Sequence, residues 1–453
     1  MPGDDATGSF GLSDNEKSRL IHRMRRKSSR EIHSSYREDF SSLEGDDIPD
    51  FSFKDLPGYQ DLDIIWRAAG QAGIEYPFFL CHEGIARDTT RINGKTFLNF
   101  STYDYLDLNG SQAVNQAAAQ AMQKYGTSAS ASRLVAGERP VHRELETALA
   151  NFYGVQDSIV FVSGHATNVW LLCQLFDHHD LVLHDSLIHN SVIMGARFSG
   201  AKRMSFAHNN LDHLEEILLH NRRGCKKAVI ITEGLFSMDG DIPDLPRLLE
   251  LKNRYKCLLM VDEAHSLGTL GPTGRGLAEH FGLASDNIDI IMGTLSKTLC
   301  ACGGFIAGCK ELVEYLKYSA PGFVFSVGIS PPLAAASLAA INELLNKPYK
   351  VTRLQETGRF FLEYARYRGL DTGTSAGAAI TPMIVGNSLL AGMISARLVQ
   401  QCINVLPIVY PAVQENAARL RFFLSAAHNR DQVRQAVDAA AAELVRSREE
   451  LEL

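Results

Sequence analysis

The sequence lacks three features that would each assign it to a distinct class of protein. No apolar run reaches the roughly 18 residues of a membrane-spanning helix. The eight cysteines are scattered, and even Cys300 and Cys302 lack C-x-x-C spacing. We therefore expect reduced thiols in a cytoplasmic protein, with no disulfide framework and no metal site. A formal net charge of −7 gives no reason to expect nucleic-acid binding.

The polar, acidic N-terminus is not that of a secretory signal. Residues 1–55 are predicted to form an N-terminal extension, rich in Ser, Asp and Arg around the basic cluster HRMRRKSSR at residues 22–30. Two interpretations stay open: a solvated, partly helical tail, or a docking segment for a partner protein. We expect an N-terminal segment at 56–110, a large domain at 111–340 and a small C-terminal domain at 341–453.

Short apolar runs alternate with helical stretches through the large domain. Helices are expected at 111–126, between a Ser cap and a Gly, and at 142–154. The runs DSIVFVSG, DLVLHD, KKAVIITEG, CLLMVDEAH and IDIIMGTLSK are apolar on both faces, which predicts an α/β fold with a parallel sheet covered on both sides. Ligands of such sheets bind beyond the carboxyl ends of the strands. The run ends are Gly164, Asp185, Glu233, Asp262 and Lys297.

After residue 345 the pattern changes to a compact α+β domain. A helix begins near residue 350, and the strand AAITPMIVG follows it. A helix at 389–401, the strand-like INVLPIVYP, the strand ARLRFFLSAAH and a final helix complete the order.

Two local patterns suggest other functions without supporting them. GTLSKT and VDEAH together resemble nucleotide-hydrolase motifs, but a phosphate-cradling loop needs a glycine where Ser296 precedes Lys297. The acidic pair also precedes the lysine, which reverses the usual order in such enzymes. The histidines of DHHD, residues 177–180, lack a supporting ligand set and predict a turn.

Lys297 and Asp262 suggest one particular chemistry. Lysine forms an imine with an aldehyde cofactor, and pyridoxal phosphate accepts electrons only while a carboxylate keeps its ring nitrogen protonated. Asp262 ends one strand, and Lys297 follows about 35 residues later, at the end of the next strand but one or so. VSGHATN, residues 162–168, supplies a Gly turn and a helix start for the phosphate, and Thr294 and Ser296 add hydroxyls.

Several linked motifs resemble those of one family. VSGHATN, HDSLIHNSVIMGARFSGA, TEGLFSMDGDIPDL, VDEAHSLGTLGPTGRG and MGTLSKTLCACGG are similar to the α-oxoamine synthases, which are fold-type I pyridoxal-phosphate enzymes. The resemblance covers roughly residues 90–430 and implies a large domain with a mainly parallel seven-stranded sheet. GTSASASRLVAGERPVHRELE, SVGISPP and ARLRFFLSAAH look most like members that work beside polyketide synthases.

The resemblance implies a role for each matching residue. Lys297 would hold the cofactor and later move the substrate α-proton, Asp262 would hold the ring nitrogen, and His189 would stack on the ring. The remaining cofactor contacts would be His265 and Ser237 on the phenolic oxygen, and Gly164, His165 and Thr294 on the phosphate. Arg421 would bind the amino-acid carboxylate, although Arg419 shares its strand face and either arginine could do so.

Departures from the family pattern fall on residues of the expected site. His165 stands where family members often have Tyr or Phe, and Tyr103 stands where many have Asn, so Tyr103 would shape the substrate pocket. Ser326-Val327 replaces a hydroxyl pair that the family's partner subunit offers to the phosphate, so only Ser326 could bond there. Taken alone, His189 could also be a core histidine, Ser237 a turn residue and Arg421 a surface arginine.

The expected reaction is a decarboxylative condensation. A small amino acid (glycine, alanine or serine) would join an acyl thioester, giving an α-amino ketone, with the acyl chain on a carrier protein or coenzyme A. An acidic carrier would dock on basic residues, either those at 22–30 or CKKAV with Arg222 and Arg223. The family also implies a homodimer. Two alternatives are an aminotransferase and an inactive regulatory subunit. His265 argues against the aminotransferase, and the presence of Lys297 argues against the inactive subunit.

Overall fold

The computed structural model describes residues 51–71, 77–410 and 412–451. Packing divides the chain into two units, Met1–Phe79 and Leu80–Leu453. The described part of the first contains the short turn η3 (Phe53–Asp55) and helix α2 (Pro57–Gln71). Among the described residues, no helix combines the length and apolar character that crossing a bilayer requires. Every candidate site residue lies in the second unit.

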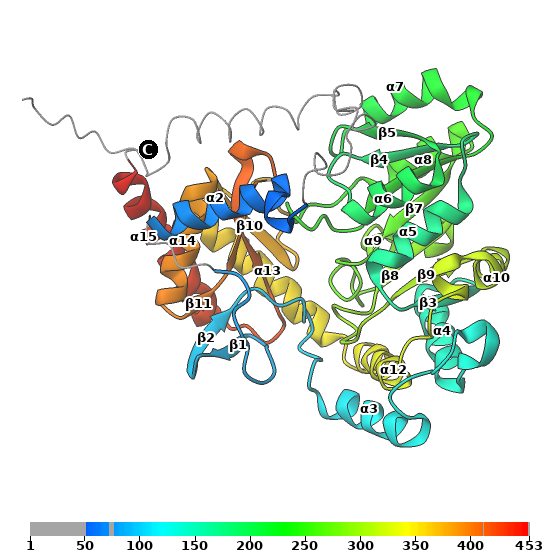
Figure 1. Cartoon of the computed structure of the whole chain (residues 1–453), viewed down its shortest axis with the longest axis horizontal. Helices are drawn as coiled ribbons and strands as arrows, with labels where there is room; N and C mark the ends of the chain where they lie inside the picture. Colours follow the sequence, from blue (N-terminus) through cyan, green and yellow to red (C-terminus); the bar gives the residue numbers. More distant parts are fainter. Residues whose placement is uncertain (1–50, 72–76, 411, 452–453) are drawn as a thin grey trace, which may run out of the picture. The chain divides into compact units, whose positions relative to one another are not determined.

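The second unit is built on a seven-stranded sheet (Figure 1). Its order is β3-β9-β8-β7-β6-β4-β5, and only β9 runs antiparallel to its neighbours. This confirms the predicted α/β fold with a mainly parallel sheet. The strands are β3 (Asp157–Phe161), β4 (Leu181–Asp185), β5 (Lys202–Phe206), β6 (Ala228–Glu233), β7 (Leu258–Asp262), β8 (Ile290–Thr294) and β9 (Gly304–Gly308).

Alternate residues of these strands enter two separate cores. In β6, Ile230 belongs to one core, whereas Val229 and Ile231 belong to the other. This two-sided burial explains why the strands read as continuous apolar runs. Helices α4 (Pro140–Tyr153), α7 (Leu211–Asn221) and α8 (Leu245–Tyr255) contribute to the first core, and α5 (Gly164–Leu175), α6 (Asn190–Ser199) and α10 (Lys310–Ser319) to the second.

The predicted helix ends follow from their caps. Helix α3 (Gln112–Tyr125) begins after Ser111, whose side chain accepts the Val114 N–H, and ends at Gly126 with φ +77°. Helix α4 starts at Pro140, two residues before its predicted start.

The remaining elements of the large domain are short, apart from α12 (Pro331–Asn346), which packs on α3. The short ones are η4 (Arg133–Gly137), η5 (Arg222–Gly224), α9 (Leu277–His280), η6 (Ser285–Asn287) and α11 (Pro321–Val324).

The C-terminal part confirms the predicted α+β order. Its elements are α13 (Tyr349–Tyr367), β10 (Ile380–Gly386), α14 (Ser388–Gln400), β11 (Ile403–Asn404), β12 (Leu406–Ile408), η7 (Glu415–Ala417), β13 (Ala418–Phe423) and α15 (Arg430–Glu450). A three-stranded antiparallel sheet has the order β10-β13-β12, so β13 is its central strand.

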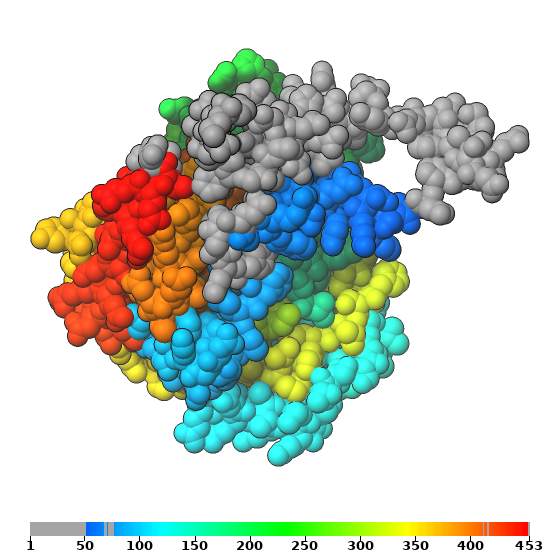
Figure 2. Space-filling model, turned by 60° about the vertical axis from the view of Figure 1, so that its left-hand side comes forward, coloured from blue at the N-terminus to red at the C-terminus, as the bar shows by residue number. Residues whose placement is uncertain are grey.

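The first strands of the second unit join this C-terminal part. Strands β1 (Thr89–Ile92) and β2 (Lys95–Asn99) form a hairpin, and β11 runs parallel to β2. Segments about 300 residues apart are therefore neighbours. In Figure 2 the light-blue surface of the hairpin region borders the orange surface of the C-terminal part.

Candidate active site

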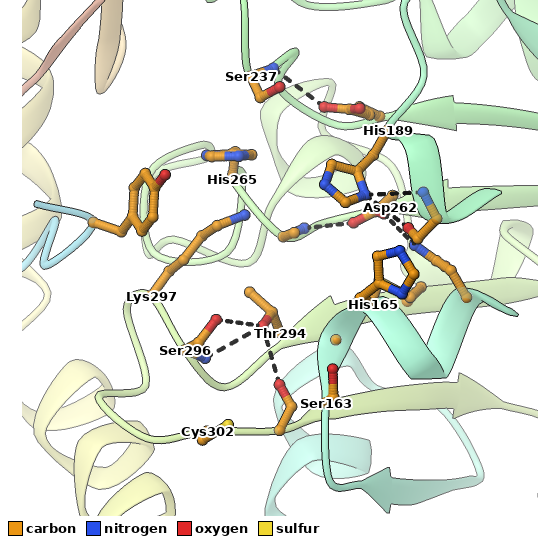
Figure 3. Close-up of a pocket in the computed structure, with 18 of the residues that line it drawn as sticks. Ser163, His165, His189, Ser237, Asp262, His265, Thr294, Ser296, Lys297 and Cys302 are labelled. Atoms are coloured by element: carbon orange, nitrogen blue, oxygen red, sulfur yellow. Dashed lines mark hydrogen bonds between the residues drawn. The ribbon is translucent and has the colours of Figure 1, made fainter. Parts of the chain in front are cut away.

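A cavity of about 370 Å³ opens at the carboxyl ends of β6, β7 and β8. Each of these strands ends in a polar residue that lines it: Glu233, Asp262 and Thr294. The cavity brings together all but one of the predicted site residues: Tyr103, Gly164, His165, His189, Ser237, Asp262, His265, Thr294, Lys297 and Arg421 (Figure 3).

Lys297 and Asp262 come from adjacent strands, not from strands that are next but one. Strands β7 and β8 pair in parallel, with Asp262 opposite Met292, and Lys297 lies in the loop after β8. The prediction overestimated the separation because only helical and loop segments lie between these strands. Burial lowers the pKa of Lys297 to about 8, although the carboxylates of Asp262 and Glu233 oppose this shift.

Sequence analysis did not reveal the chain of polar side chains that holds the Asp262 carboxylate. Asn168 Nδ2 donates to Asp262 Oδ2 and to Ser191 Oγ, both at 2.9 Å. Ser191 Oγ in turn lies 2.7 Å from His189 Nδ1. The Ala264 N–H donates to Asp262 Oδ1 at 3.0 Å. Because Asn168 is part of VSGHATN, the motif that predicted a phosphate turn also contains the partner of the ring-nitrogen carboxylate.

His189 caps the N-terminus of α6 and lines the cavity. Its side chain accepts the Ser191 N–H, which fixes the ring at the helix entrance. Burial lowers the pKa of His189, which favours a neutral imidazole.

Glu233 lies beside this group, and the sequence analysis marked it only as a strand end. It is 3% exposed and stands opposite Asp262 in the sheet register. The Ser237 N–H donates to its Oε2 at 3.1 Å. Burial, together with the Asp262 charge, raises the pKa of Glu233 to about 8, and the Lys297 charge opposes this shift.

His265 contacts a residue that sequence reasoning did not assign to the site. The Tyr105 hydroxyl lies 2.6 Å from His265 Nδ1. Burial lowers the pKa of His265 well below its ordinary value. The Phe423 ring lies parallel to the imidazole, at 6.3 Å between centroids, and Tyr103 meets it edge-on.

The opposite end of the cavity is formed by the start of α5. Ser163 caps this helix by accepting the Ala166 N–H. The first N–H groups of an α-helix have no partner within the helix, so those of Gly164 and His165 are available to an anion. Thr294 Oγ1 lies 2.8 Å from Ser296 Oγ and donates to the Gly303 carbonyl at 3.0 Å.

The structure separates the roles of the two arginines on β13. Arg419 forms a salt bridge with Asp239 and donates to the Met238 carbonyl at 3.1 Å. Arg421 lines the cavity and donates through Nη1 to the Ser237 carbonyl at 2.9 Å. Its Nε has no partner among the described residues. Arg421 is therefore the one that can bind a carboxylate in the cavity.

Other predicted features lie elsewhere. Ser326 follows α11 and does not line this cavity, so its proposed contact with a partner subunit's phosphate stays a prediction. The basic cluster at 22–30 lies outside the described residues. Of the second basic group, Arg222 binds the carbonyls of Tyr255, Cys225 and Lys256, and Lys227 pairs with Asp180.

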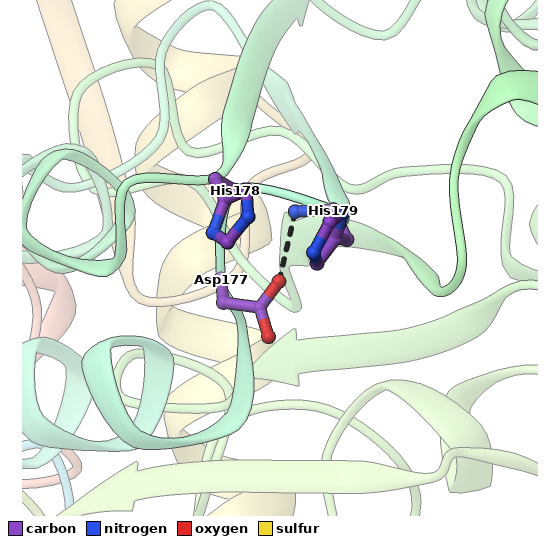
Figure 4. Close-up of side chains that lie close together, drawn as sticks. All are labelled: Asp177, His178 and His179. Carbon is purple, nitrogen blue, oxygen red and sulfur yellow. Dashed lines mark hydrogen bonds between the residues drawn. The ribbon is translucent and has the colours of Figure 1, made fainter.

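The predicted turn at residues 177–180 is confirmed (Figure 4). The His179 N–H donates to Asp177 Oδ1 at 2.8 Å, and the Asp177 N–H donates to Asp180 Oδ2 at 3.0 Å. Asp177, His178 and His179 are exposed, and one ligand atom from each lies within 4.8 Å of the others. The hydrogen bonds of the turn account for this grouping.

Comparisons with known proteins agree with this geometry. The family described as aminotransferase class I and II matches residues 95–439. The 8-amino-7-oxononanoate synthase of Petrotoga mobilis is 39% identical over 341 residues, covering 75% of this chain and 86% of that enzyme. The structure of serine palmitoyltransferase from S. paucimobilis, with bound PLP and myriocin, superposes with a TM-score of 0.83 at 26% identity, covering 86% of this chain and 98% of that one. An 8-amino-7-oxononanoate synthase from Francisella tularensis gives a TM-score of 0.68 at 29% identity, covering 77% and 98%.

The chain belongs to the aminotransferase class I and II family and has the fold-type I architecture of pyridoxal-phosphate enzymes. Within that family it is an α-oxoamine synthase, a pyridoxal-phosphate-dependent enzyme that transfers an acyl group.

The residues of the cavity fit pyridoxal phosphate. Three buried polar atoms of its wall lack partners among the described residues: Glu233 Oε1, Asn168 Oδ1 and Arg421 Nε. A Cβ at Gly164 would stand 2.8 Å from Thr294 Oγ1, so only glycine leaves the start of α5 open there. The cavity thus combines an amine, a buried carboxylate and a helix N-terminus, as an aldehyde, a ring nitrogen and a phosphate require.

Proposed function

We propose that this enzyme condenses a small amino acid with an acyl thioester and releases CO₂, which yields an α-amino ketone. The amino acid loses its Cα proton, and Cα forms a bond to the acyl carbon while the C–S bond breaks and the thiol leaves. The original carboxylate then departs as CO₂, and Cα takes up a proton in its place. The observation that carries the proposal is that Lys297, Asp262 and Arg421 line one cavity.

Lys297 is the residue proposed to move the proton. Pyridoxal phosphate, when bound, supplies an electron sink for the charge that develops at Cα. Lys297 holds the cofactor and, once the amino acid has displaced it, takes the Cα proton at Nζ. A base must be uncharged, and the pKa of about 8 leaves a usable fraction of the amine neutral at neutral pH.

The other groups bind and orient. Asp262, held by Asn168, keeps the ring nitrogen protonated, and His189 packs against the ring. His265 and Ser237 bond the phenolic oxygen, and His265 also donates to the acyl oxygen or the carboxylate. The amides of Gly164 and His165, with the Thr294 hydroxyl, hold the phosphate. These contacts act where charge develops, and one such donor contributes roughly 10²–10³ in rate.

Arg421 binds the amino-acid carboxylate, and Tyr103 borders the space for its side chain. Alanine and glycine are the preferred candidates for the amino-acid substrate, because we identify no residue that would bind the hydroxyl of serine. The name 8-amino-7-oxononanoate favours alanine, because it describes a methyl group on the amine-bearing carbon, which is the side chain of alanine.

The acyl donor is proposed to be a carrier protein that docks on basic residues. Reversing the charge of Arg25 and Arg26 should slow transfer from carrier-bound acyl groups and spare transfer from acyl-coenzyme A. Unchanged carrier kinetics would rule out this docking segment. A place beside a polyketide synthase stays a prediction, supported by three segments of sequence, whereas the curated relatives above are 8-amino-7-oxononanoate synthases.

We also propose a cytoplasmic homodimer. The support for the cytoplasm is that all eight cysteines are free thiols, which reducing compartments favour. Beside Ser326, Phe325 is 85% exposed and Val327 is 49% exposed, an apolar pair that a second copy would cover. Sedimentation of the wild type and of Phe325→Glu tests this, since charge at an interface should shift the protein toward monomer. A wild-type monomer would refute the dimer.

The reaction itself is tested by incubating the purified enzyme with glycine, alanine or serine and an acyl thioester. We expect thiol and CO₂ to be released in equal amounts with one amino acid preferred, and Lys297→Ala to release neither. Formation of a keto acid without CO₂ would instead indicate an aminotransferase. An inert protein that fails to bind pyridoxal phosphate would indicate a regulatory subunit.

A further inference from the structure

Tyr105 is fixed against one edge of the His265 ring. Its hydroxyl lies 2.6 Å from His265 Nδ1, and both side chains are buried, Tyr105 at 0% and His265 at 7% exposure. Backbone bonds hold the tyrosine from two sides: its N–H donates to the Tyr103 carbonyl, and its own carbonyl accepts the Ala426 N–H at 2.7 Å. Two aromatic rings flank the imidazole: Phe423 lies parallel to it, at 6.3 Å between centroids, and Tyr103 meets it edge-on.

Counting protons decides which atom donates in this hydrogen bond. The structure gives the Tyr105 hydroxyl no other partner within its described residues. If Nδ1–H donated, the phenol hydrogen would be buried without an acceptor, which is costly. If the phenol donates, Nδ1 accepts and the ring proton lies on Nε2. His265 lines the cavity, and because Nδ1 bonds Tyr105, Nε2 is the ring nitrogen that can donate to a group in the cavity.

The ionisation of both groups supports the same arrangement. Burial raises the pKa of Tyr105 well above its ordinary value, so the phenol keeps its proton. Burial lowers the pKa of His265 well below its ordinary value, and the ring carries one proton. The charged and titratable groups that face this ring are Lys297, Arg421, His189, Tyr103 and Tyr105, of which the first three also lower its pKa.

We propose that Tyr105 is a positioning residue that fixes His265 as its Nε2–H tautomer. His265 therefore meets an oxygen in the cavity only as a hydrogen-bond donor, and it does not serve as a base. Proton removal from Cα is left to Lys297 alone. The kinetic consequence rests on the proposed function, whereas the position of the proton does not.

The proton position is measured directly by long-range ¹H–¹⁵N NMR of the histidine rings in the full-length enzyme, with His265→Gln to assign the signal. We expect Nδ1 of His265 to show the shift of an unprotonated, hydrogen-bonded nitrogen. Tyr105→Phe should move this signal toward a mixture of tautomers. A wild-type spectrum with the proton on Nδ1 would overturn the proposal, whatever reaction the enzyme catalyses.

The kinetic test compares two buried phenols. Tyr105→Phe removes the hydroxyl that contacts His265. Tyr153→Phe removes a hydroxyl that is equally buried but has no partner among the described residues, so it is the matched control. We expect kcat/KM to fall about tenfold in Tyr105→Phe, with a changed pH profile, and less than about twofold in Tyr153→Phe.

Three outcomes can be told apart. Equal kcat/KM in the wild type and Tyr105→Phe would refute the positioning role. Equal losses in both variants would show that any buried hydroxyl matters, which also refutes it. If no condensation occurs even in the wild type, the proposed function fails, and the NMR experiment still decides the tautomer. Thermal unfolding of each variant confirms that it is folded.

Discussion

Among single side chains, Asn168 has the most consequential contacts that the sequence did not reveal. It donates to the Asp262 carboxylate and, through Ser191, connects to His189. A hydrogen bond to a charged group contributes about 1.5–3 kcal/mol. Asn168→Ala should therefore weaken pyridoxal-phosphate binding about tenfold or more, which equilibrium dialysis measures.

Two further variants sharpen this prediction. Asn168→Asp places a second carboxylate beside Asp262 and should cost more than the alanine, because like charges repel. Asn115→Ala is the control, since Asn115 lies on the exposed face of α3 and its side chain donates to the Gly110 carbonyl, away from the cavity. Equal affinities in the wild type and Asn168→Ala would contradict the role that we assign to the amide.

The N-terminus of α5 illustrates how a backbone position can be restricted by its neighbour. A methyl group at Gly164 would stand 2.8 Å from Thr294 Oγ1, whereas one at Gly224 meets nothing within 4 Å. Gly164→Ala should force Thr294 and the helix start apart and weaken cofactor binding by about tenfold or more. Gly224→Ala should bind the cofactor like the wild type. Unaltered binding in both variants would show that the phosphate lies elsewhere.

A charged histidine joins the end of β4 to the turn that follows β6. His208 Nδ1 lies 2.9 Å from Asp185 Oδ1 and its Nε2 lies 2.8 Å from Asp241 Oδ2, while the Phe236 ring packs edge-on. Burial opposes the charged form, but the two carboxylates prevail and raise the pKa of His208 to about 10. Because the folded pKa exceeds the unfolded value, this stabilisation is complete below pH ~6.5 and is lost as the pH rises through about 10.

His208→Gln should therefore lower the Tm by roughly 5 °C at pH 7, and the difference from wild type should shrink as the pH rises from ~6.5 to about 10. Thermal unfolding at a series of pH values measures this. His220→Gln, at an exposed position on α7, is the control and should give only a small difference in Tm. A difference in Tm between wild type and His208→Gln that stays constant across the series would contradict a charged His208 between the two carboxylates.

Strand interiors and helix caps were predictable because each depends on a few consecutive residues. The buried runs DLVLHD and CLLMVDEAH predicted β4 and β7, and Ser111 and Gly126 marked the ends of α3. The edge strand β5 has exposed side chains, and β9 begins and ends with glycine, so neither shows an apolar run. Asn168 and Tyr105 were missed for another reason: their partners lie 94 and 160 residues away.

The large and small sheets meet through the turn that carries Ser237. Arg419 of β13 pairs with Asp239, and the Ala376 N–H donates to the Gly240 carbonyl at 2.9 Å. Arg421 leaves the same strand to bind the Ser237 carbonyl. The position of the proposed carboxylate-binding group therefore depends on how firmly the two sheets are held together.

Asp239→Asn tests this dependence. It removes the carboxylate charge that pairs with the buried Arg419, and breaking a buried ion pair typically costs about 3–5 kcal/mol. We expect a lower Tm and a severalfold higher KM for the amino acid, with a smaller change in kcat. Glu250→Gln, which removes a surface ion pair with Arg247, is the control. It should change the free energy of unfolding by less than about 1 kcal/mol and leave KM near the wild-type value. An unchanged KM in Asp239→Asn would show that the position of Arg421 does not depend on the ion pair between Arg419 and Asp239.

The parallel pairing of β2 with β11 sets an order of events during synthesis. The Leu98 N–H donates to the Cys402 carbonyl at 2.8 Å, and the Phe100 N–H donates to the Asn404 carbonyl at 2.9 Å. A ribosome makes about 5–20 residues per second, so the hairpin waits roughly 15 s or longer for the strand that completes its sheet. Tyr103 and Tyr105 follow that hairpin directly. The large sheet can form in the emerging chain, but its catalytic edge gains these two aromatic side chains in their final places only as translation ends.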